Sequence, residues 1–371
     1  MEITVNRNEL VRELTAVQGV VERKTTIPIL SNFLFEATGD ALAVTATDLD
    51  LSLRTSCRAE VKKEGACTVP ARKLFDYVKL LPDLPISLKL LENHWVSIRA
   101  GRSTTKMVGM ARTNFPALPV TPAGDTVRIP AQTLLIMIAK TIFAIASEES
   151  RYTLNGALLV LKPESVAMVA TDGHRLAHIE NTSAKLEVTG ERRTLIPKKA
   201  MHELHTLLQQ TESEALELGE DDSTLFFHIG SRLLTARKLT GQFPNYEAVL
   251  PRENSKMIVV QSGDMASAVQ RVAQFADERS KAIRLRLENN EVHLQANSNE
   301  MGEAEDVIET NYQGEPMTIG FNSDYLLDFL RAANADEVRL ELKDPQSAGL
   351  LRPADDGEQF KYRYVVMPMR I

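Results

Sequence analysis

The sequence has few of the features that mark a secreted, disulfide-bonded or membrane protein. Of its 371 residues, two are cysteine and one is tryptophan. Cys57 and Cys67 are too few for a disulfide framework or a metal-binding quartet, so we interpret them as strand or core thiols. The most apolar stretch, residues 133–146, is interrupted by Lys140 and is too short to span a bilayer. The start, MEITVNRNEL, lacks the apolar core of a secretory signal, and we expect a cytoplasmic protein.

The usual fingerprints of catalysis are also missing. The sequence has no G-x-S-x-G, and His202 and His205 lack the H-E-x-x-H spacing of a zinc-binding helix. One stretch, ATDGHRLA at 170–177, places Asp172 two residues before His174. It could be a catalytic dyad, half a metal site, or a turn between two strands with His174 as an ordinary polar residue. A dyad needs a nucleophile and a metal site needs more ligands, so the turn is favoured and no cofactor is expected.

The charge is acidic overall and unevenly spread. The formal net charge is −7, which argues against a protein that holds nucleic acid mainly by electrostatic attraction. Residues 1–124 carry +3, residues 125–252 carry −2, and residues 253–371 carry −8. A basic first third and an acidic last third are complementary, which suits head-to-tail association of two copies.

The chain repeats itself at an interval of about 124 to 128 residues. The Ala-Thr-Asp at 46–48 recurs at 170–172, and the Phe-Pro at 115–116 recurs at 243–244. A third copy follows with weaker similarity, in which residues 293–307 stand where the Thr-Asp segments stood. Repeats of this kind indicate one structural unit used several times.

Each copy divides again into two halves with the same order of elements. Alternating and helical apolar patterns predict a strand, a helix and three strands, twice in each copy. The predicted class is therefore α+β, with three similar domains at 1–120, 126–250 and 255–371. Their linkers are the proline-containing stretches 116–126 and 244–255. Whether such repeats stack openly or close into a ring stays undecided at this level. Six helices are predicted, at 7–20, 71–81, 131–147, 198–209, 264–276 and 323–333.

The pattern as a whole resembles the bacterial DNA sliding clamps, the beta subunits of DNA polymerase III. The resemblance is carried by three tandem copies together with ATDGHRLA, GQFPNYEAVLP at 241–251 and the terminal YVVMPMRI. It implies a DNA polymerase processivity factor that is not an enzyme. It further implies a head-to-tail homodimer, closed as a ring of six DNA-clamp domains around duplex DNA and bound without regard to sequence. The replicative polymerase, the clamp loader and other proteins would attach through short linear peptides.

The resemblance also implies positions for these contacts. The peptide-binding pocket would be formed by Leu154, Thr171, Gly173, His174, Arg175, Leu176, Pro244, Val249, Val365, Met367, Pro368, Met369 and Arg370. Flexible methionines and aliphatic walls suit a site that accepts several different peptides. The DNA-facing residues would be Lys24, Arg72, Lys73, Tyr152, Lys198 and Lys199. The six predicted helices together carry +3 in a chain of −7, which fits helices that line a hole for DNA.

The charge division predicts the dimer contacts. We expect the basic end of the first copy to face the acidic third copy of a second chain. The basic and acidic residues of this interface are Arg99, Arg102, Lys106, Glu300, Glu303 and Glu305, with Met107 and Phe275 as apolar contacts. Two other functions stay open: a monomeric repeat scaffold that binds peptides without DNA, and a hydrolase that uses Asp172 and His174.

Overall fold

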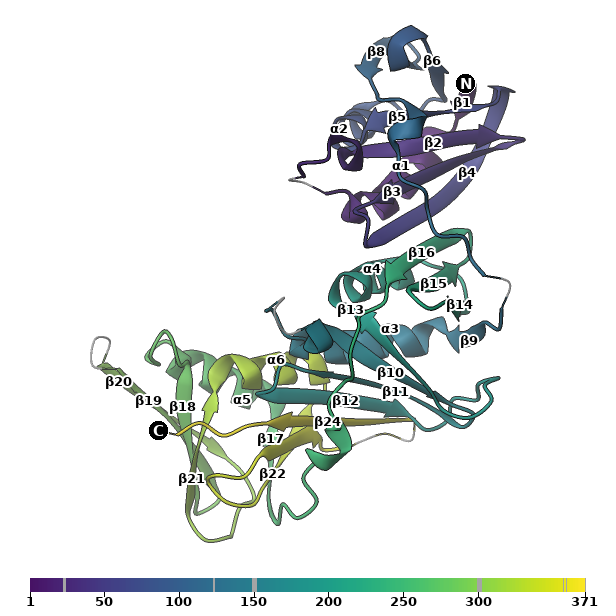
Figure 1. Cartoon of the computed structure of the whole chain (residues 1–371). Helices are drawn as coiled ribbons and strands as arrows, with labels where there is room; N and C mark the ends of the chain where they lie inside the picture. The colour runs from purple at the N-terminus through teal and green to yellow at the C-terminus, as the bar shows by residue number, and fades with distance from the viewer. Residues whose placement is uncertain are drawn as a thin grey trace. The chain divides into compact units, whose positions relative to one another are not determined.

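The computed structural model describes residues 1–22, 25–122, 124–148, 152–298, 302–355, 357 and 359–370. Its elements follow the predicted order, a strand, a helix and three strands, twice in each of three copies (Figure 1). The predicted α+β class is therefore confirmed. The chain forms two compact units, Met1–Leu135 with Lys199–Lys238, and Ile136–Lys198 with Leu239–Ile371.

The first unit is built on one branched sheet. Across its described residues the main order is β8-β7-β6-β1-β4-β16-β15-β14-β9, and β2 with β3 and β5 branches from β4. The bounds are β1 Glu2–Val5, β2 Asn32–Thr38, β3 Ala41–Thr47, β4 Leu51–Lys63, β5 Gly65–Pro70, β6 Ile86–Leu90, β7 Trp95–Ala100, β8 Ser103–Val108, β9 Val127–Pro130, β14 Ala215–Glu220, β15 Thr224–Ile229 and β16 Arg232–Arg237. The long strand β4 pairs with β16 at its start and with β1 at its end. It therefore joins the first copy to half of the second.

The helices of the first unit cover the sheet with their apolar faces. α1 (Arg7–Val17) begins at Asn6, whose side chain accepts hydrogen bonds from the backbone N–H groups of Asn8 and Glu9. α2 (Ala71–Leu80) follows Pro70, which ends β5 and has no N–H to leave unpaired. α1 packs on α2 and on β4. α4 (Lys198–Gln209) buries five side chains at helical spacing, from Ala200 to Leu208.

The second unit contains two sheets. Eight described strands follow the order β13-β10-β11-β12-β24-β23-β22-β17, and four follow the order β20-β19-β18-β21. The bounds are β10 Gly156–Lys162, β11 Ser165–Thr171, β12 Arg175–Asn181, β13 Arg192–Pro197, β17 Lys256–Gln261, β18 Ala282–Glu288, β19 Glu291–Ser298, β20 Gly302–Glu309, β21 Met317–Asn322, β22 Glu337–Leu342, β23 Gly349–Pro353 and β24 Phe360–Val366. The pairing of β12 with β24 joins the second copy to the third.

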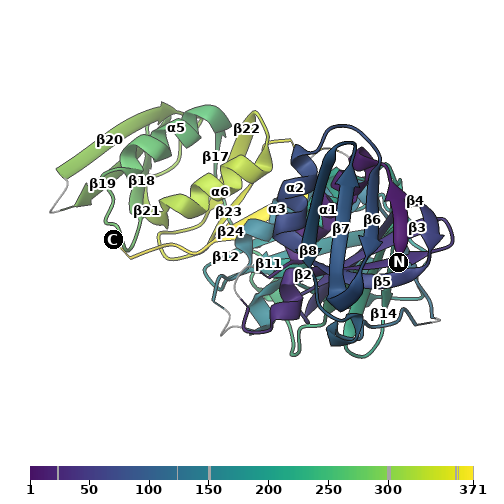
Figure 2. The ribbon, with the colours of Figure 1, turned by 90° about the horizontal axis from the view of Figure 1, so that it is seen from above.

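Two helices of the third copy run side by side, as both views show (Figure 1 and Figure 2). α5 (Ser262–Ala273) packs on the four-stranded sheet, and α6 (Ser323–Ala333) contacts β21, β23 and β24. α3 (Ala131–Thr141) ends six residues earlier than predicted and continues as a single 3-10 turn, Ile142–Ala144. At that point the carbonyl of Phe143 accepts a hydrogen bond from Arg175 instead of an intrahelical one. A tertiary contact thus occupies this carbonyl just after the helix ends.

The second copy contributes to both compact units, because β9 and β14 to β16 lie in the first and β10 to β13 in the second. The compact units therefore do not coincide with the predicted repeat boundaries. No helix within the described ranges is long and apolar enough to cross a membrane.

Candidate functional site

The ATDGHRLA segment forms a turn between β11 and β12. The Thr171 hydroxyl donates to the carbonyl of Arg175 at 2.6 Å and accepts from the N–H of Gly173 at 3.1 Å. The Asp172 carboxylate accepts from the N–H groups of His174 and Arg175, at 2.9 and 3.0 Å. Gly173 has φ 91°, a conformation that glycine adopts without strain. The Asp172 carboxylate thus holds backbone N–H groups, as the predicted turn requires, and His174 is left exposed.

The Arg175 side chain enters a buried network rather than solvent. Its guanidinium donates to Asp172 at 3.0 Å, to Asp328 on α6 at 2.7 Å, and to the carbonyl of Phe143 at 2.7 Å. It also lies 4.3 Å from the ring centroid of Tyr325. Burial opposes its charge, but the neighbouring Tyr364, Asp328 and Asp172 raise the pKa of Arg175, so it stays a cation. Arg175 therefore fixes the turn to α6 and leaves the neighbouring side chains to form a surface.

Next to the turn, the last strand of the chain completes an apolar cluster. Leu176 lies directly opposite Val365, because β12 and β24 pair in antiparallel register. Both side chains belong to one cluster that also includes Leu158, Val160, Ala167, Val169, Tyr246 and Leu350, with Phe243 and Leu250 packed against it. The cluster brings together side chains from Leu158 to Val365, more than 200 positions apart in sequence.

The rim of this cluster is open to solvent. The N–H of Met367 donates to the carbonyl of His174 at 2.9 Å, which keeps the chain beside the turn after β24 ends. Met367 is 43% exposed and Val249 is 38% exposed, which is high for apolar side chains. Pro244 is exposed in the same segment as Val249, and Leu154 is half-buried in a 3-10 turn (Tyr152–Leu154). Thr171, His174, Leu176, Val365 and Met367 are thus brought together.

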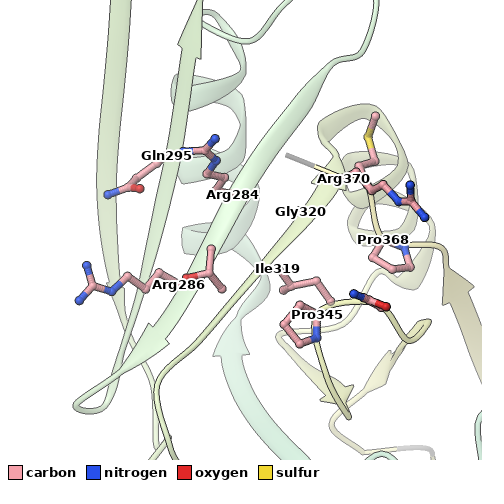
Figure 3. Close-up of a pocket in the computed structure, with 11 residues that line it drawn as sticks. Arg284, Arg286, Gln295, Ile319, Gly320, Pro345, Pro368 and Arg370 are labelled. Atoms are coloured by element: carbon pink, nitrogen blue, oxygen red, sulfur yellow. The ribbon is translucent and has the colours of Figure 1, made fainter.

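The last three predicted pocket residues turn toward the four-stranded sheet. The N–H of Met369 donates to the carbonyl of Gly320 on β21 at 2.9 Å. There Pro368, Met369 and Arg370 line a cavity of about 860 Å³. Figure 3 shows Pro368 and Arg370 on one side of Gly320, with Arg284, Arg286 and Gln295 on the other. The sequence did not identify Arg284 or Arg286, because their strand shows only the alternation of an ordinary half-exposed strand.

The predicted DNA-facing residues differ in their exposure to solvent and in whether a carboxylate or carbonyl already binds their charged group. Arg72 and Lys73 are exposed in the first turn of α2, and Arg72 lies 4.0 Å from Asp76. Lys198 is half-buried and donates to the carbonyl of Ala146 at 3.5 Å. Lys199 forms an ion pair with Asp48 at 2.9 Å, and this hydrogen bond raises the pKa of Lys199. Tyr152 is exposed, and Lys24 lies outside the described residues.

Four of the predicted dimer residues lie on two strands at sheet edges. Arg99 is on β7 and Arg102 in the turn that follows it, while Lys106 and Met107 are on β8, where the order of the first sheet ends. Glu303 and Glu305 are on β20, the first strand in the order of the four-stranded sheet. Phe275 is half-buried after α5, and Glu300 lies outside the described residues. Each of these edge strands can accept another strand.

The two thiols are buried, as predicted, and burial raises the pKa of Cys57 and of Cys67 to about 12. Such thiols are poor nucleophiles at neutral pH. Among the residues that the structure describes, no group of three or more His, Cys, Asp or Glu side chains could hold a metal ion.

Comparison with known proteins accounts for the full length of the chain. Three family models match, described as the N-terminal domain (residues 1–119), the central domain (128–245) and the C-terminal domain (247–370) of the DNA polymerase III beta subunit. The beta sliding clamp of Pseudomonas putida is 37% identical over 378 residues, and that of Caulobacter vibrioides is 35% identical, each with complete coverage of both chains.

Solved structures give the same result. The DNA polymerase III beta subunit of Pseudomonas aeruginosa superimposes with a TM-score of 0.94 at 35% identity, with complete coverage of both chains. A sliding clamp from Bartonella birtlesii bound to griselimycin gives a TM-score of 0.94 at 34% identity, again over the whole of both chains. The resemblance predicted from the sequence is therefore confirmed, and a catalytic role for Asp172 and His174 is set aside. The chain belongs to the bacterial beta sliding clamps, the non-catalytic processivity factors of DNA polymerase III.

Proposed function

We propose that two copies of this chain associate head to tail and close into a ring of six domains, with the domain bounds 1–120, 126–250 and 255–371. The ring encircles duplex DNA in the cytoplasm and slides along it. The replicative polymerase, the clamp loader and other proteins attach through short peptides. The acidic net charge suits this role, because a closed ring needs few phosphate contacts to stay on DNA.

The observation that carries the proposal is the pairing of β12 with β24. It sets Leu176 opposite Val365 and keeps the exposed Met367 beside His174. A peptide that lays an apolar side chain on this surface buries it against a wall that is already formed. Each well-buried side chain contributes roughly 1.5–3 kcal/mol, and ordering of the peptide offsets much of that. We expect micromolar affinity, about −8 kcal/mol.

Support for the ring comes from the two edge strands. β8 carries Lys106 and follows Arg102, whereas β20 carries Glu303, Glu305 and Asp306. An interface that joins two different surfaces benefits from complementary charges, and in the described part of the chain β8 and β20 carry such charges at the ends of their sheets.

Retention on circular DNA tests the proposal directly. The clamp is loaded on nicked circular DNA with a clamp loader, freed of unbound protein by gel filtration, and the DNA is then cut once. We expect retention on the circle and release from the linear form. Equal retention on both forms would indicate ordinary binding and would exclude a closed ring. A monomeric mass in solution would favour the open scaffold instead.

A further inference from the structure

The turn at Asp172 has a counterpart in the first copy with the same hydrogen bonds. The Thr47 hydroxyl donates to the carbonyl of Leu51 at 2.9 Å and accepts from the N–H of Leu49 at 3.1 Å. The Asp48 carboxylate accepts from the N–H groups of Asp50 and Leu51, at 3.0 and 2.7 Å. Residues 47–51 thus repeat the four hydrogen bonds between side chain and backbone that form the turn of residues 171–175.

The strand beside this turn is repeated as well. In the second unit, Leu176 pairs with Val365 and the N–H of Met367 donates to the carbonyl of His174. In the first unit, Ser52 pairs with Thr235 and the N–H of Arg237 donates to the carbonyl of Asp50 at 2.8 Å. The segments that follow β8 and β16 are also equivalent. Phe115 packs in an apolar cluster that contains Leu34, and Phe243 packs against an apolar cluster that contains Leu158. The junction of the first and second copies is therefore built like the candidate pocket.

A cavity of about 200 Å³ lies at this first junction. Its walls include the turn residues Leu49 and Asp50, the strand residues Ser52 and Thr235, Arg237, and the linker prolines Pro116 and Pro119. Pockets that hold a whole small molecule measure about 300–1,000 Å³. The cavity is smaller than that, so it suits one side chain of a peptide rather than a compact ligand.

The chemistry of this cavity differs from that of the candidate pocket. Ser52 and Thr235 replace Leu176 and Val365, and their hydroxyls bond to each other at 2.5 Å. Arg237 replaces Met367, Asp50 replaces His174, and their charged groups lie 3.5 Å apart with more than half of each side chain exposed. Exposed ion pairs of this kind are weak, so either partner can turn to a ligand at little cost.

One position of the turn carries a side chain where the backbone favours glycine. Leu49 has φ 82°, close to the 91° of Gly173. A residue with a Cβ atom is strained in this region because the Cβ approaches the backbone. The Leu49 side chain is 56% exposed and lies on the cavity, so it contributes little to the core in return. Its position supplies an apolar wall to the cavity.

We propose that the cavity at residues 47–52 is a second peptide-binding site, which takes a side chain with a terminal carboxamide, that is Asn or Gln. A carboxamide has an acceptor oxygen for the Arg237 guanidinium and donor N–H groups for the Asp50 carboxylate. A carboxylate would be repelled by Asp50, an ammonium would be repelled by Arg237, and an aliphatic side chain would desolvate both charges without replacing their hydrogen bonds. Leu49 and the two prolines pack against the methylene part.

Methyl NMR of the full-length clamp with two blocked tripeptides tests this site. The probes are acetyl-Gly-Gln-Gly-amide and acetyl-Gly-Met-Gly-amide, which have side chains of similar length. At probe concentrations of about 50 mM, we expect the glutamine probe to shift the methyl signals of Leu49, Ala117 and Leu118, and the methionine probe to bind there roughly tenfold more weakly. No shift of these signals by the glutamine probe, or equal affinity for both probes, would overturn the proposal.

Two variants separate binding from folding. Arg237→Met replaces the guanidinium with the side chain that the candidate pocket has at the equivalent position, Met367. The affinity for the glutamine probe should fall about tenfold. Leu49→Gly removes a wall while relieving backbone strain, so it should weaken the probe without lowering stability. Unchanged affinity in both variants would refute the site. Met367→Arg, in the candidate pocket, is the matched control and should leave the glutamine shifts intact. Because the methyl signals of Leu176, Val249 and Val365 report the candidate pocket separately, failure at one site leaves the other assignment untouched.

Discussion

Glu13 on α1 and Arg232 on β16 form a buried ion pair, with Oε2 and Nε 3.1 Å apart and the two side chains 2% and 9% exposed. The Thr55 hydroxyl and the Arg12 guanidinium donate to the same carboxylate. Burial opposes ionisation of Glu13, but the hydrogen bonds from Thr55, Arg232 and Arg12 prevail and lower its pKa. The pair ties the first copy to the strands of the second copy within the first unit.

Breaking this pair should destabilise the first unit strongly. Arg232→Met removes the buried cation beside Glu13 and leaves the largely exposed Arg12 as its cationic partner, so we expect a loss of up to about 3–5 kcal/mol. The double variant Glu13→Leu/Arg232→Met should recover a large part of the loss, because no charge is then left buried. Urea unfolding followed by tryptophan fluorescence measures the stability of the single and the double variant. Lys89→Met, which breaks the exposed pair with Glu2, is the control and should leave the midpoint nearly unchanged. A double variant as unstable as Arg232→Met would contradict this account.

The C-terminal residues should control partner binding without affecting assembly. Deletion of residues 367–371 removes the exposed Met367 and one side of the larger cavity, formed by Pro368, Met369 and Arg370, but leaves β24 intact. We expect peptide and polymerase binding to be abolished and the dimer to persist, since the proposed dimer edges are β8 and β20. Peptide titration and sedimentation on the same truncated protein test both expectations. Full peptide affinity in the truncated protein would show that the pocket assignment is wrong.

The helix cations should contribute unequally to the salt dependence of DNA binding. Arg72→Ala/Lys73→Ala removes two exposed charges, so the slope of log K against log salt should fall by about 1–2. Lys198→Ala/Lys199→Ala should change the slope by about 1 or less, because Lys198 is half-buried and Asp48 already pairs with Lys199. Lys62→Ala/Lys63→Ala, on the exposed end of β4, is the control. If the slope is insensitive to Arg72 and Lys73, these residues do not face DNA.

Charge reversal should show which residues form the dimer interface. Glu303→Arg places a cation on β20, which faces the strand that carries Lys106 in the proposed interface, so the dimer should weaken at low salt. Adding Lys106→Glu should restore it in part, because the two charges are then exchanged. Light scattering across a dilution series at low and high salt measures the change. Glu217→Arg, on a strand with neighbours on both sides, is the matched control. Identical dilution curves for Glu303→Arg and Glu217→Arg would count against the interface.

The stability of the first unit should depend on pH through Glu203 on α4. This carboxyl packs against Gly19, where an added Cβ would lie 2.5 Å from Oε1. Burial and the nearby Asp48 raise the pKa of Glu203 to about 7. Because the pKa is higher in the folded state than in the unfolded chain, stability is greatest below the unfolded pKa and falls as pH rises toward 7. The loss is at most roughly 3 kcal/mol.

Glu203→Gln keeps the shape and removes the titration. It should flatten this part of the pH profile and stabilise the protein at about pH 8 relative to the parent. Urea unfolding at several pH values between about 5 and 8 provides the measurement, and Glu217→Gln serves as the exposed control. A profile that keeps its full slope in Glu203→Gln would assign the effect to another group.

The sequence predicted those parts of the molecule whose structure depends on residues close to one another in the chain. Alternation and helical spacing gave the element order, and the Thr-Asp pair identified a turn, because the hydrogen bonds that form the turn join residues within five positions of one another. Contacts between distant segments were missed. Asp328 lies 153 positions from Arg175, and Asp48 lies 151 from Lys199, with no local signal for either pair. The end of α3 was also misplaced, and just beyond it the Phe143 carbonyl bonds to Arg175, 32 positions away.

The division of the second copy between two compact units limits which fragments of this protein can fold without losing strand partners. A fragment cut at 126–250 would keep β12 without β24 and β16 without β4, so two long strands would lose their outer neighbours. Uncovered edges of that kind recruit other chains and lead to aggregation. A fragment that spans a junction, such as residues 126–371, retains the β12–β24 pairing with Leu176 opposite Val365, so of these two strands β16 alone loses its outer neighbour. For screening of inhibitors or for crystallisation of partner peptides, the useful piece is therefore a pair of adjacent copies and not a single repeat.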